Sequence, residues 1–281
     1  MGIMMKKKAY ITAIRLLTFM LSLSGCAQLE QAKNAIDPTK DLSVDYGWIV
    51  NDSSPREEAV GIVVTNNGDK AATNVSVLIT PYDADGNVLS FSEDDPGYGS
   101  GSSLRTVIIN TIMPGEKAAV LDDGFIDFNN APDHIGVTIS SVQWKNPEKL
   151  PAGSVDIEEF SCEPWSDVAY VKLMNNTENI YDVEDKLMVN LLNIVFISYD
   201  AAGKIVGADM ETVQYLGAGE ETTVEMYLDG TLNGDGAETV EAYVFRSDFD
   251  PNNDDIYTDS EGNEYTTEEV IQYLEEKKNN S

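Results

Sequence analysis

The sequence predicts an all-β protein, in which two tandem β-sandwich domains are followed by a short C-terminal helix. The first observation is that short runs rich in β-branched residues alternate with Gly, Asn, Asp and Pro turns, at about the 8–12-residue spacing typical of sandwiches. The second observation is that the pattern of 59–144 recurs at 168–246. The third is that helical periodicity is scarce before the last residues of the chain.

The two copies of the repeat share their order of motifs. Each has an Asn-Asn pair at the end of a β-rich run, and each then has a second run that ends in a Tyr-Asp-x-x-Gly turn. A Pro-Gly-Glu or Ala-Gly-Glu turn precedes the next predicted strand, and a further strand ends each copy. Because one order of turns predicts one order of strands, we expect the two copies to share a fold.

Alternation within the runs predicts strands with one buried face. Val75, Val77 and Ile79 alternate with polar neighbours, so we expect one face to point into a core. Gly86 suits a left-handed turn position, and the aspartates before it can accept backbone hydrogen bonds two residues on. We interpret 66–68, Asn-Asn-Gly, as a tight hairpin whose residues tolerate positive φ.

These motifs resemble the FxLYD family of Ig-like bacterial surface domains. Phe196–Asp200 reads Phe-Ile-Ser-Tyr-Asp, close to the motif that names the family, whereas the first copy lacks the Phe and neither copy has Leu before Tyr. The resemblance covers 59–144 and 168–246 and implies two tandem Ig-like β-sandwich domains on a lipoprotein. It supplies no catalytic residues.

The N-terminal segment resembles the signal of a bacterial lipoprotein. Lys6, Lys7 and Lys8 precede an apolar run, 9–23, of the length of a secretory signal and short of the ~20 residues that span a bilayer. The run ends at Leu-Ser-Gly-Cys, which looks like a lipobox with Cys26 as the acylated residue. The resemblance implies cleavage before Cys26 and a membrane lipid anchor at the bacterial cell envelope, facing outside the cytoplasm. The alternative is an uncleaved membrane anchor with Cys26 an ordinary thiol.

Composition shifts predict the boundaries between the segments of the chain. The sequence is divided in the following order: signal peptide 1–25, tether 26–41, first Ig-like domain 42–146, linker 147–154, second Ig-like domain 155–250, and acidic hairpin with C-terminal helix 251–281. In the last segment the spacing of Thr266 and Glu269 matches a capping box. We expect this helix to pack on the second domain.

Charge restricts the partners. The chain carries 18 basic and 49 acidic residues, a formal net charge of −31 at pH 7. Such a surface repels nucleic acid and anionic headgroups, so we expect no nucleic-acid partner. It could attract cations or basic peptides, or it could serve solubility alone.

Each copy has an insertion that the other lacks. In the first copy the insertion is a Gly/Ser-rich stretch, 92–103, in which Tyr98 is the one aromatic residue and a candidate binding contact; the alternative is a surface excursion. In the second copy Thr177–Lys186 is inserted after the Asn-Asn pair, with Ile180 and Tyr181 as apolar residues. Either insertion could mark a binding face.

The acidic segment 248–264 is the candidate metal site. Calcium prefers six to eight oxygen ligands, and Asp250, Asn252, Asp254 and Glu261 hold positions one, three, five and twelve of an EF-hand-like spacing. Asp255 stands at the sixth position, where the sharp turn requires glycine. The alternative is a solvated acidic loop, in which case no cofactor is expected.

Motifs for catalysis are scarce. The chain has one histidine, His134, and neither a nucleophile elbow nor a glycine loop for phosphate. Its two cysteines are Cys26 and Cys162, and acids and apolar residues near Cys162 predict a raised thiol pKa rather than a reactive nucleophile.

Three hypotheses for function follow. The first is a lipid-anchored, non-enzymatic surface protein that presents two Ig-like modules for contact with an unknown protein or glycan. The second is a calcium-binding or calcium-stabilised module that uses the segment 248–264. The third is a carboxylate-dependent hydrolase.

Overall fold

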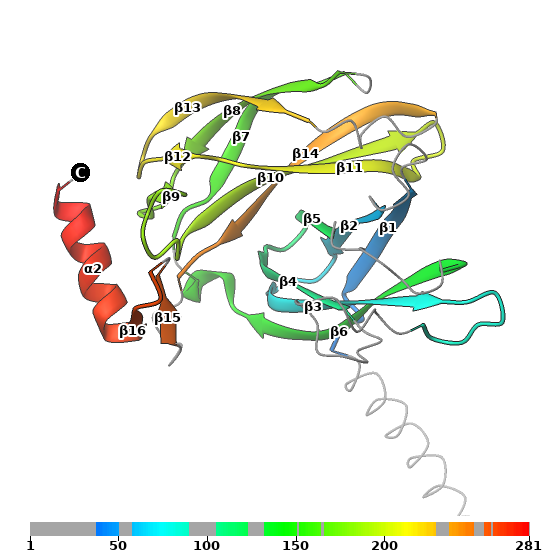
Figure 1. Ribbon diagram of the computed structural model, residues 1–281, viewed down its shortest axis with the longest axis horizontal. Helices are drawn as coiled ribbons and strands as arrows, with labels where there is room; N and C mark the ends of the chain where they lie inside the picture. Colours follow the sequence, from blue (N-terminus) through cyan, green and yellow to red (C-terminus); the bar gives the residue numbers. More distant parts are fainter. Residues whose placement is uncertain are drawn as a thin grey trace, which may run out of the picture. The chain divides into compact units, whose positions relative to one another are not determined.

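The computed structural model describes residues 38–50, 58–89, 105–122, 132–150, 152–163, 166–228, 236–249, 256–259 and 261–280. The chain divides into two compact units, Met1–Lys40 and Asp41–Ser281. In the first unit the described residues, 38–40, form a turn. All the sheets described below belong to the second unit (Figure 1).

The first sandwich consists of two antiparallel sheets. In the described residues one sheet has the strand order β1-β2-β5 and the other has the order β4-β3-β6. A core of aliphatic side chains, among them Val60, Val77 and Ile109, fills the space between them. The strands are β1 (Leu42–Val50), β2 (Glu58–Asn66), β3 (Ala71–Tyr82), β4 (Arg105–Ile112), β5 (Lys117–Asp122) and β6 (His134–Lys145).

The second sandwich repeats this topology strand for strand. Its described sheets have the orders β13-β8-β7 and β11-β10-β14, which match the two sheets of the first sandwich. Leu173, Leu192 and Phe196 lie in the core between them. The strands are β7 (Val155–Ser161), β8 (Val168–Asn175), β10 (Leu191–Asp200), β11 (Ile205–Thr212), β13 (Glu221–Tyr227) and β14 (Ala237–Ser247). The predicted all-β fold of two sandwiches is confirmed.

Smaller elements complete the described chain. A 3-10 helix, η1 (Pro147–Lys149), lies in the segment predicted as the linker. Two short strand pairs accompany the second sandwich, and the predicted C-terminal helix is present beside β9 (Figure 1). These elements are β9 (Tyr181–Asp182), β12 (Tyr215–Leu216), β15 (Ile256–Thr258), β16 (Glu264–Thr266) and α2 (Thr267–Asn280).

The two sandwiches share a third hydrophobic core. The β1-β2-β5 sheet of the first sandwich packs its outer face on the β11-β10-β14 sheet of the second. Both of these sheets are therefore buried on two faces, as is usual for the inner layers of a stack. The buried members of this core are Ile49, Ala59, Val63, Ala119, Val195, Ile197, Ile205, Ala208 and Tyr243.

Glycines bring these two sheets close together. A Cβ atom on Gly47 would lie 2.5 Å from the backbone oxygen of Ile205, and one on Gly61 would lie 2.8 Å from the Cβ of Ala208. Neither distance is compatible with a side chain, so both positions require glycine for the observed packing.

One turn interpretation is wrong. The Asn-Asn-Gly stretch at 66–68 is not a tight hairpin with positive φ, because it connects β2 to β3, which lie in different sheets. Among the described non-glycine residues, positive φ values occur at Asn74 and Met188. The connection is held instead by the Asn66 side chain, which is completely buried.

Candidate functional site

The motifs of the repeat have structural roles. Asp83 Oδ1 accepts from the backbone N–H groups of Asp85 and Asn87, at 3.0 and 2.7 Å. Asp200 repeats this turn in the second sandwich, accepting from the N–H groups of Ala202 and Lys204 at 2.9 and 2.8 Å. The glycines of the two turns have φ values of +80° and +78°, as the sequence predicts. These aspartates are therefore used by the fold.

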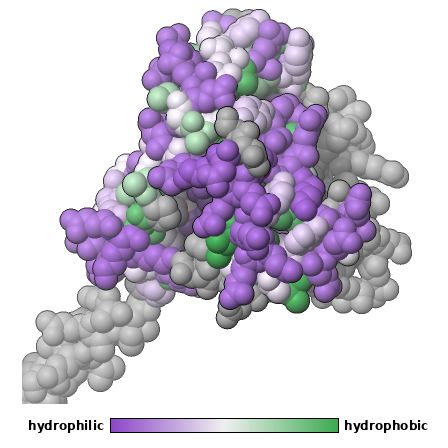
Figure 2. Space-filling model, turned by 90° about the vertical axis from the view of Figure 1, so that its left-hand side faces the viewer, coloured by the Kyte–Doolittle hydropathy of each residue, from purple (hydrophilic) through white to green (hydrophobic). Residues whose placement is uncertain are grey.

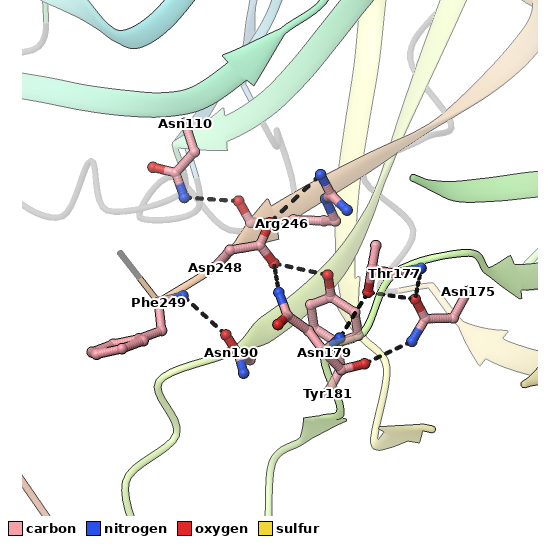
Figure 3. A network of polar contacts seen from close by, with 9 residues as sticks. All are labelled: Asn110, Asn175, Thr177, Asn179, Tyr181, Asn190, Arg246, Asp248 and Phe249. Carbon is pink, nitrogen blue, oxygen red and sulfur yellow. Dashed lines mark hydrogen bonds and ion pairs between the residues drawn. The ribbon is translucent and has the colours of Figure 1, made fainter. Parts of the chain in front are cut away.

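The insertion Thr177–Lys186 of the second sandwich holds a polar network (Figure 3). Asn175, completely buried at the end of β8, accepts from the backbone N–H and the hydroxyl of Thr177 at 2.9 and 2.7 Å. The Thr177 hydroxyl oxygen in turn accepts from the N–H of Asn179 at 3.1 Å. Asn175 thus fixes Thr177, and Thr177 in turn fixes Asn179, in the part of the insertion that precedes β9.

Asp248 is the centre of this network. Its Oδ1 accepts from the hydroxyl of Tyr181 at 2.7 Å and from the Asn179 amide at 3.2 Å, and its Oδ2 lies 3.5 Å from Nη2 of Arg246 (Figure 3). Burial, followed by the negative charge of Asp248, raises the pKa of Tyr181 to about 12. Tyr181 is thus a neutral hydrogen-bond donor across the physiological pH range.

The network reaches the first sandwich. The side-chain amide of Asn110, on β4, donates to the backbone oxygen of Arg246, on β14, at 2.9 Å (Figure 3). Asn190 joins from the other side, because its Oδ1 accepts from the backbone N–H of Phe249 at 2.9 Å. Side chains of both sandwiches therefore hold the end of β14 and the segment that follows it.

Helix α2 docks on the same insertion. Lys277 forms ion pairs with Asp185 and, at 3.1 Å, with Asp182, while the hydroxyl of Tyr273 donates to Asp185 at 3.0 Å. Val270 is completely buried. The expectation that the helix packs on the second domain is confirmed, and the insertion supplies the acidic half of the contact.

The predicted capping box is also confirmed. The backbone N–H of Glu269 donates to the Thr266 hydroxyl at 3.3 Å, and the N–H of Thr266 donates to the Glu269 carboxylate at 2.8 Å. This reciprocal pair satisfies two backbone donors at the start of the helix. The helix therefore begins where the sequence predicts, immediately after β16.

A pocket of about 230 Å³ lies between α2 and the insertion. We call it the α2 pocket. Its apolar lining comes from Ile180, Phe249, Ile271 and Leu274. Figure 2 shows the side of the molecule that carries α2, where hydrophilic residues cover most of the coloured surface and hydrophobic groups are scattered among them.

Most of the predicted site residues lie outside the described part of the chain. These are Cys26, Tyr98, Asp250, Asn252 and Asp254. Their predicted roles in lipidation, partner contact and calcium binding stay predictions.

Glu261 is the calcium candidate that the structure places. It is exposed in the turn between β15 and β16, where Asp259 accepts from the N–H groups of Glu261 and Asn263 at 3.0 and 2.9 Å. This is a third copy of the turn seen at Asp83 and Asp200. Hydrogen bonds, that from the Asn263 side chain foremost, lower the pKa of Asp259 to about 2.

The described residues contain no group of three or more His, Cys, Asp or Glu side chains placed to hold a metal ion. In the same residues, no helix has the length and apolar character required to cross a bilayer.

His134 and Cys162 lie apart from the α2 pocket. The His134 ring stacks on Tyr82 with centroids 5.0 Å apart, and its Nδ1 lies 3.1 Å from a carboxylate oxygen of Asp133. Burial, then the charges of Glu163 and Asp209, raise the pKa of the Cys162 thiol. The predicted direction of the thiol pKa is thus confirmed.

Sequence reasoning missed the residues that assemble this region. Asn110, Asn190 and Asp248 come from three distant segments, and no spacing rule connects them. One signal was available: the acidic residues 178–185 and the lysines at 277–278 have opposite charges, as two docking segments often have.

The comparisons with known proteins give no family. No family model matches the chain, and no curated protein matches it. A solved structure titled "X-ray structure of Northeast Structural Genomics Consortium target SoR45" matches at 11% identity, covers 65% of this chain and 83% of its own, and has a TM-score of 0.19. A likeness of this size carries no argument about fold or function.

Proposed function

We propose that the chain is a lipid-anchored, non-enzymatic surface protein of the bacterial envelope, which presents its two sandwiches as one rigid body to a partner protein or glycan. The observation that carries this proposal is the shared core between the sandwiches. Gly47 and Gly61 permit the close approach, and Tyr243 and Val195 are buried within it.

Rigidity supports a binding role. Two domains on a flexible linker sample many orientations, and fixing one of them on binding costs entropy. A shared apolar core fixes the orientation before the partner arrives. The hydrogen bond from Asn110 to Arg246 adds a directional constraint at the edge of that core. Loops on such a scaffold are held at constant separations, which favours a composite recognition surface.

The negative charge of the chain favours a partner that is basic or neutral. With a net charge of −31 the chain repels anionic polymers and attracts basic surfaces, and this attraction accelerates association at low salt. A basic partner, or a neutral glycan, is compatible with this field.

The anchor is tested by substitution of the lipobox cysteine. A single acyl chain binds a membrane weakly, whereas two or more anchor stably, so Cys26→Ala should move the protein from the membrane fraction to the soluble fraction. Metabolic labelling with a palmitate analogue should mark the wild type only. A wild-type chain that is retained in the membrane unlabelled and uncleaved would contradict the proposed anchor.

Binding is tested with the soluble Cys26→Ala chain, labelled with a fluorophore on lysine. We expect saturable binding to envelopes prepared from a strain that lacks this gene. Treatment of the envelopes with protease should abolish binding if the partner is a protein, and treatment with glycan hydrolases should abolish it if the partner is a glycan. Binding that does not saturate, or that equals the binding of an unrelated acidic protein of similar size, would overturn the proposal.

A further inference from the structure

The α2 pocket combines an apolar lining with one polar donor. Ile180, Ile271 and Leu274 are each only partly buried, and they lie beside the ring of Phe249. The volume of about 230 Å³ is below the range of about 300–1,000 Å³ that drug-sized ligands occupy. The pocket therefore matches a single side chain better than a whole cofactor.

Asn190 supplies the donor. The residue is 6% exposed, and its Oδ1 is used by the backbone N–H of Phe249. Its amide nitrogen carries two hydrogens and has no acceptor among the residues that the structure describes. Figure 3 shows this nitrogen on the side of the amide that points away from Phe249, and Asn190 lines the pocket. This nitrogen still reaches solvent, so a carbonyl oxygen of a ligand can replace water as its acceptor.

The charges around the pocket favour a basic ligand. Lys277 is already paired with Asp182 and Asp185, and Lys278 with Glu178 at 2.6 Å. The lining also includes the exposed carboxylate of Glu275. Glu178 and Glu275 line the pocket together with Lys277 and Lys278. Asp182 and Asp185 do not line it, but both pair with Lys277, so these six groups together carry a formal charge of −2.

We propose that the α2 pocket takes one apolar side chain of a basic partner peptide, and that a backbone carbonyl of the peptide accepts a hydrogen bond from Nδ2 of Asn190. This inference rests on the proposed binding function and assigns its partner as a protein. Burial of the apolar side chain supplies the affinity, the Asn190 hydrogen bond fixes the position of the peptide backbone, and the net negative charge around the pocket selects basic flanking residues.

The test is a titration of the ¹⁵N-labelled Cys26→Ala chain, followed by NMR, with three blocked tripeptides. Acetyl-Lys-Leu-Lys-amide should cause saturable shifts of the Asn190 side-chain NH₂ signals and of the Ile271 and Leu274 amides. Acetyl-Lys-Gly-Lys-amide keeps the charge without the apolar side chain, and acetyl-Glu-Leu-Glu-amide reverses the charge. Each should bind at least about tenfold more weakly.

Two variants separate the parts of the proposal. Asn190→Asp keeps an acceptor for the Phe249 N–H and removes the donor. Because it also adds a carboxylate that attracts lysine, its effect is measured with the uncharged acetyl-Gly-Leu-Gly-amide, whose binding should weaken by about tenfold. Leu274→Ala removes part of the apolar lining from a partly exposed position and should also weaken binding, without loss of the fold. The matched control is Gln272→Ala, at an exposed position of the same helix that does not line the pocket.

Several outcomes would overturn the inference. They are equal binding of the Leu and Gly peptides, wild-type affinity in both pocket variants, and no saturable shift at millimolar peptide. Shifts of the same signals on addition of an envelope oligosaccharide alone would assign the pocket to a glycan. Shifts that depend on protein concentration alone would assign it to a second copy of this chain. The titration uses no envelopes, so its failure is distinguishable from a failure of envelope binding.

Discussion

The side chains of Asn66 and Asn175 occupy equivalent positions in the two sandwiches and make equivalent hydrogen bonds. Each is completely buried, and each Oδ1 accepts from the backbone N–H two residues on, at 2.9 Å. Each Nδ2 donates to the carbonyl four residues on, at 2.8 Å for Asn66 and 2.9 Å for Asn175. Each Nδ2 also donates to a carbonyl near the Gly-Glu turn, at 2.9 Å for Asn66 and 2.8 Å for Asn175. One amide therefore ties together three backbone segments in each domain.

We expect Asn66→Ala and Asn175→Ala each to destabilise the protein by about 3 kcal/mol, because each leaves several buried backbone groups without a partner at about 1–3 kcal/mol per group. The controls are Asn67→Ala and Asn176→Ala, one residue on, where the side chains are exposed. Chemical denaturation of all four variants measures the difference. Equal midpoints for a buried variant and its control would contradict the assigned role.

The strands and turns could be predicted because their signals are local. Alternation at Val75, Val77 and Ile79 marks a half-buried strand, and the Asp-x-x-Gly order at Asp83 and Asp200 encodes a turn in four residues. The capping pair at Thr266 is equally local. In each case the residues that make the contact lie within a few positions of one another, so spacing alone identifies them.

The packing between the sandwiches could not be predicted from the repeat, because two identical domains can be joined in many orientations. The composition of two strands did indicate that they are buried on both faces. The runs 59–64 and 191–197 are almost continuously apolar, as is typical of strands buried on both faces, whereas the alternating strands are not. Which sheet covers these runs depends on residues such as Gly47 and Ile205, which are far apart in the sequence.

A second prediction concerns this shared core. Gly47→Ala would place a methyl group 2.5 Å from the Ile205 backbone oxygen, and a backbone atom cannot move away as the end of a side chain can. We expect a loss of at least about 1–3 kcal/mol, the usual cost of overpacking. We also expect increased hydrogen exchange at β1 and β11, measured by mass spectrometry. The control is Thr138→Ala, at an exposed position of β6, which should leave exchange in both strands unchanged.

A third prediction concerns the docking of α2. Lys277→Met removes the cation from Asp185, whose side chain is only 7% exposed, and a carboxylate left in that position is unfavourable. Amide exchange across 267–280 should accelerate by about tenfold, which corresponds to about 1.4 kcal/mol. Lys278→Met is the matched control, because its ion pair with Glu178 is largely exposed and should contribute little. Equal acceleration in the two variants would contradict a specific role for Lys277.

The same ion pair determines how docking depends on pH. Burial raises the pKa of Asp185, but the hydrogen bonds from Lys277, Leu187 and Tyr273 outweigh it and lower the pKa below its ordinary value of 3.8. Burial lowers the pKa of Lys277, but Asp185 and Asp182 outweigh it and raise the pKa above 10.5. The stabilisation of docked α2 by the ionised Asp185 is therefore complete above pH 3.8, and it is lost as the pH falls through the lowered pKa of Asp185.

The stabilisation of docked α2 by the protonated Lys277 is complete below pH 10.5, and it is lost as the pH rises through the raised pKa of Lys277. Between these limits the NMR signals of α2 should not report undocking. The acid limit is checked by following the Tyr273 and Lys277 amide signals while the pH is lowered. A transition of these signals with a midpoint above pH 3.8 would contradict the lowered pKa of Asp185.

The last prediction concerns Cys162, which is the one thiol of the Cys26→Ala chain. Burial and the carboxylates of Glu163 and Asp209 raise its pKa above 9.0, so the reactive thiolate is scarce at neutral pH. Alkylation by iodoacetamide should be slower in the folded chain than in urea, and its rate should still increase with pH beyond 9.0. Glu163→Gln removes one of the raising charges and should move the profile to lower pH. A rate in the folded Cys26→Ala chain that reaches a plateau below pH 9.0 would show a thiolate stabilised by its surroundings. The surroundings of Cys162 would then have to supply a positive charge that outweighs both carboxylates.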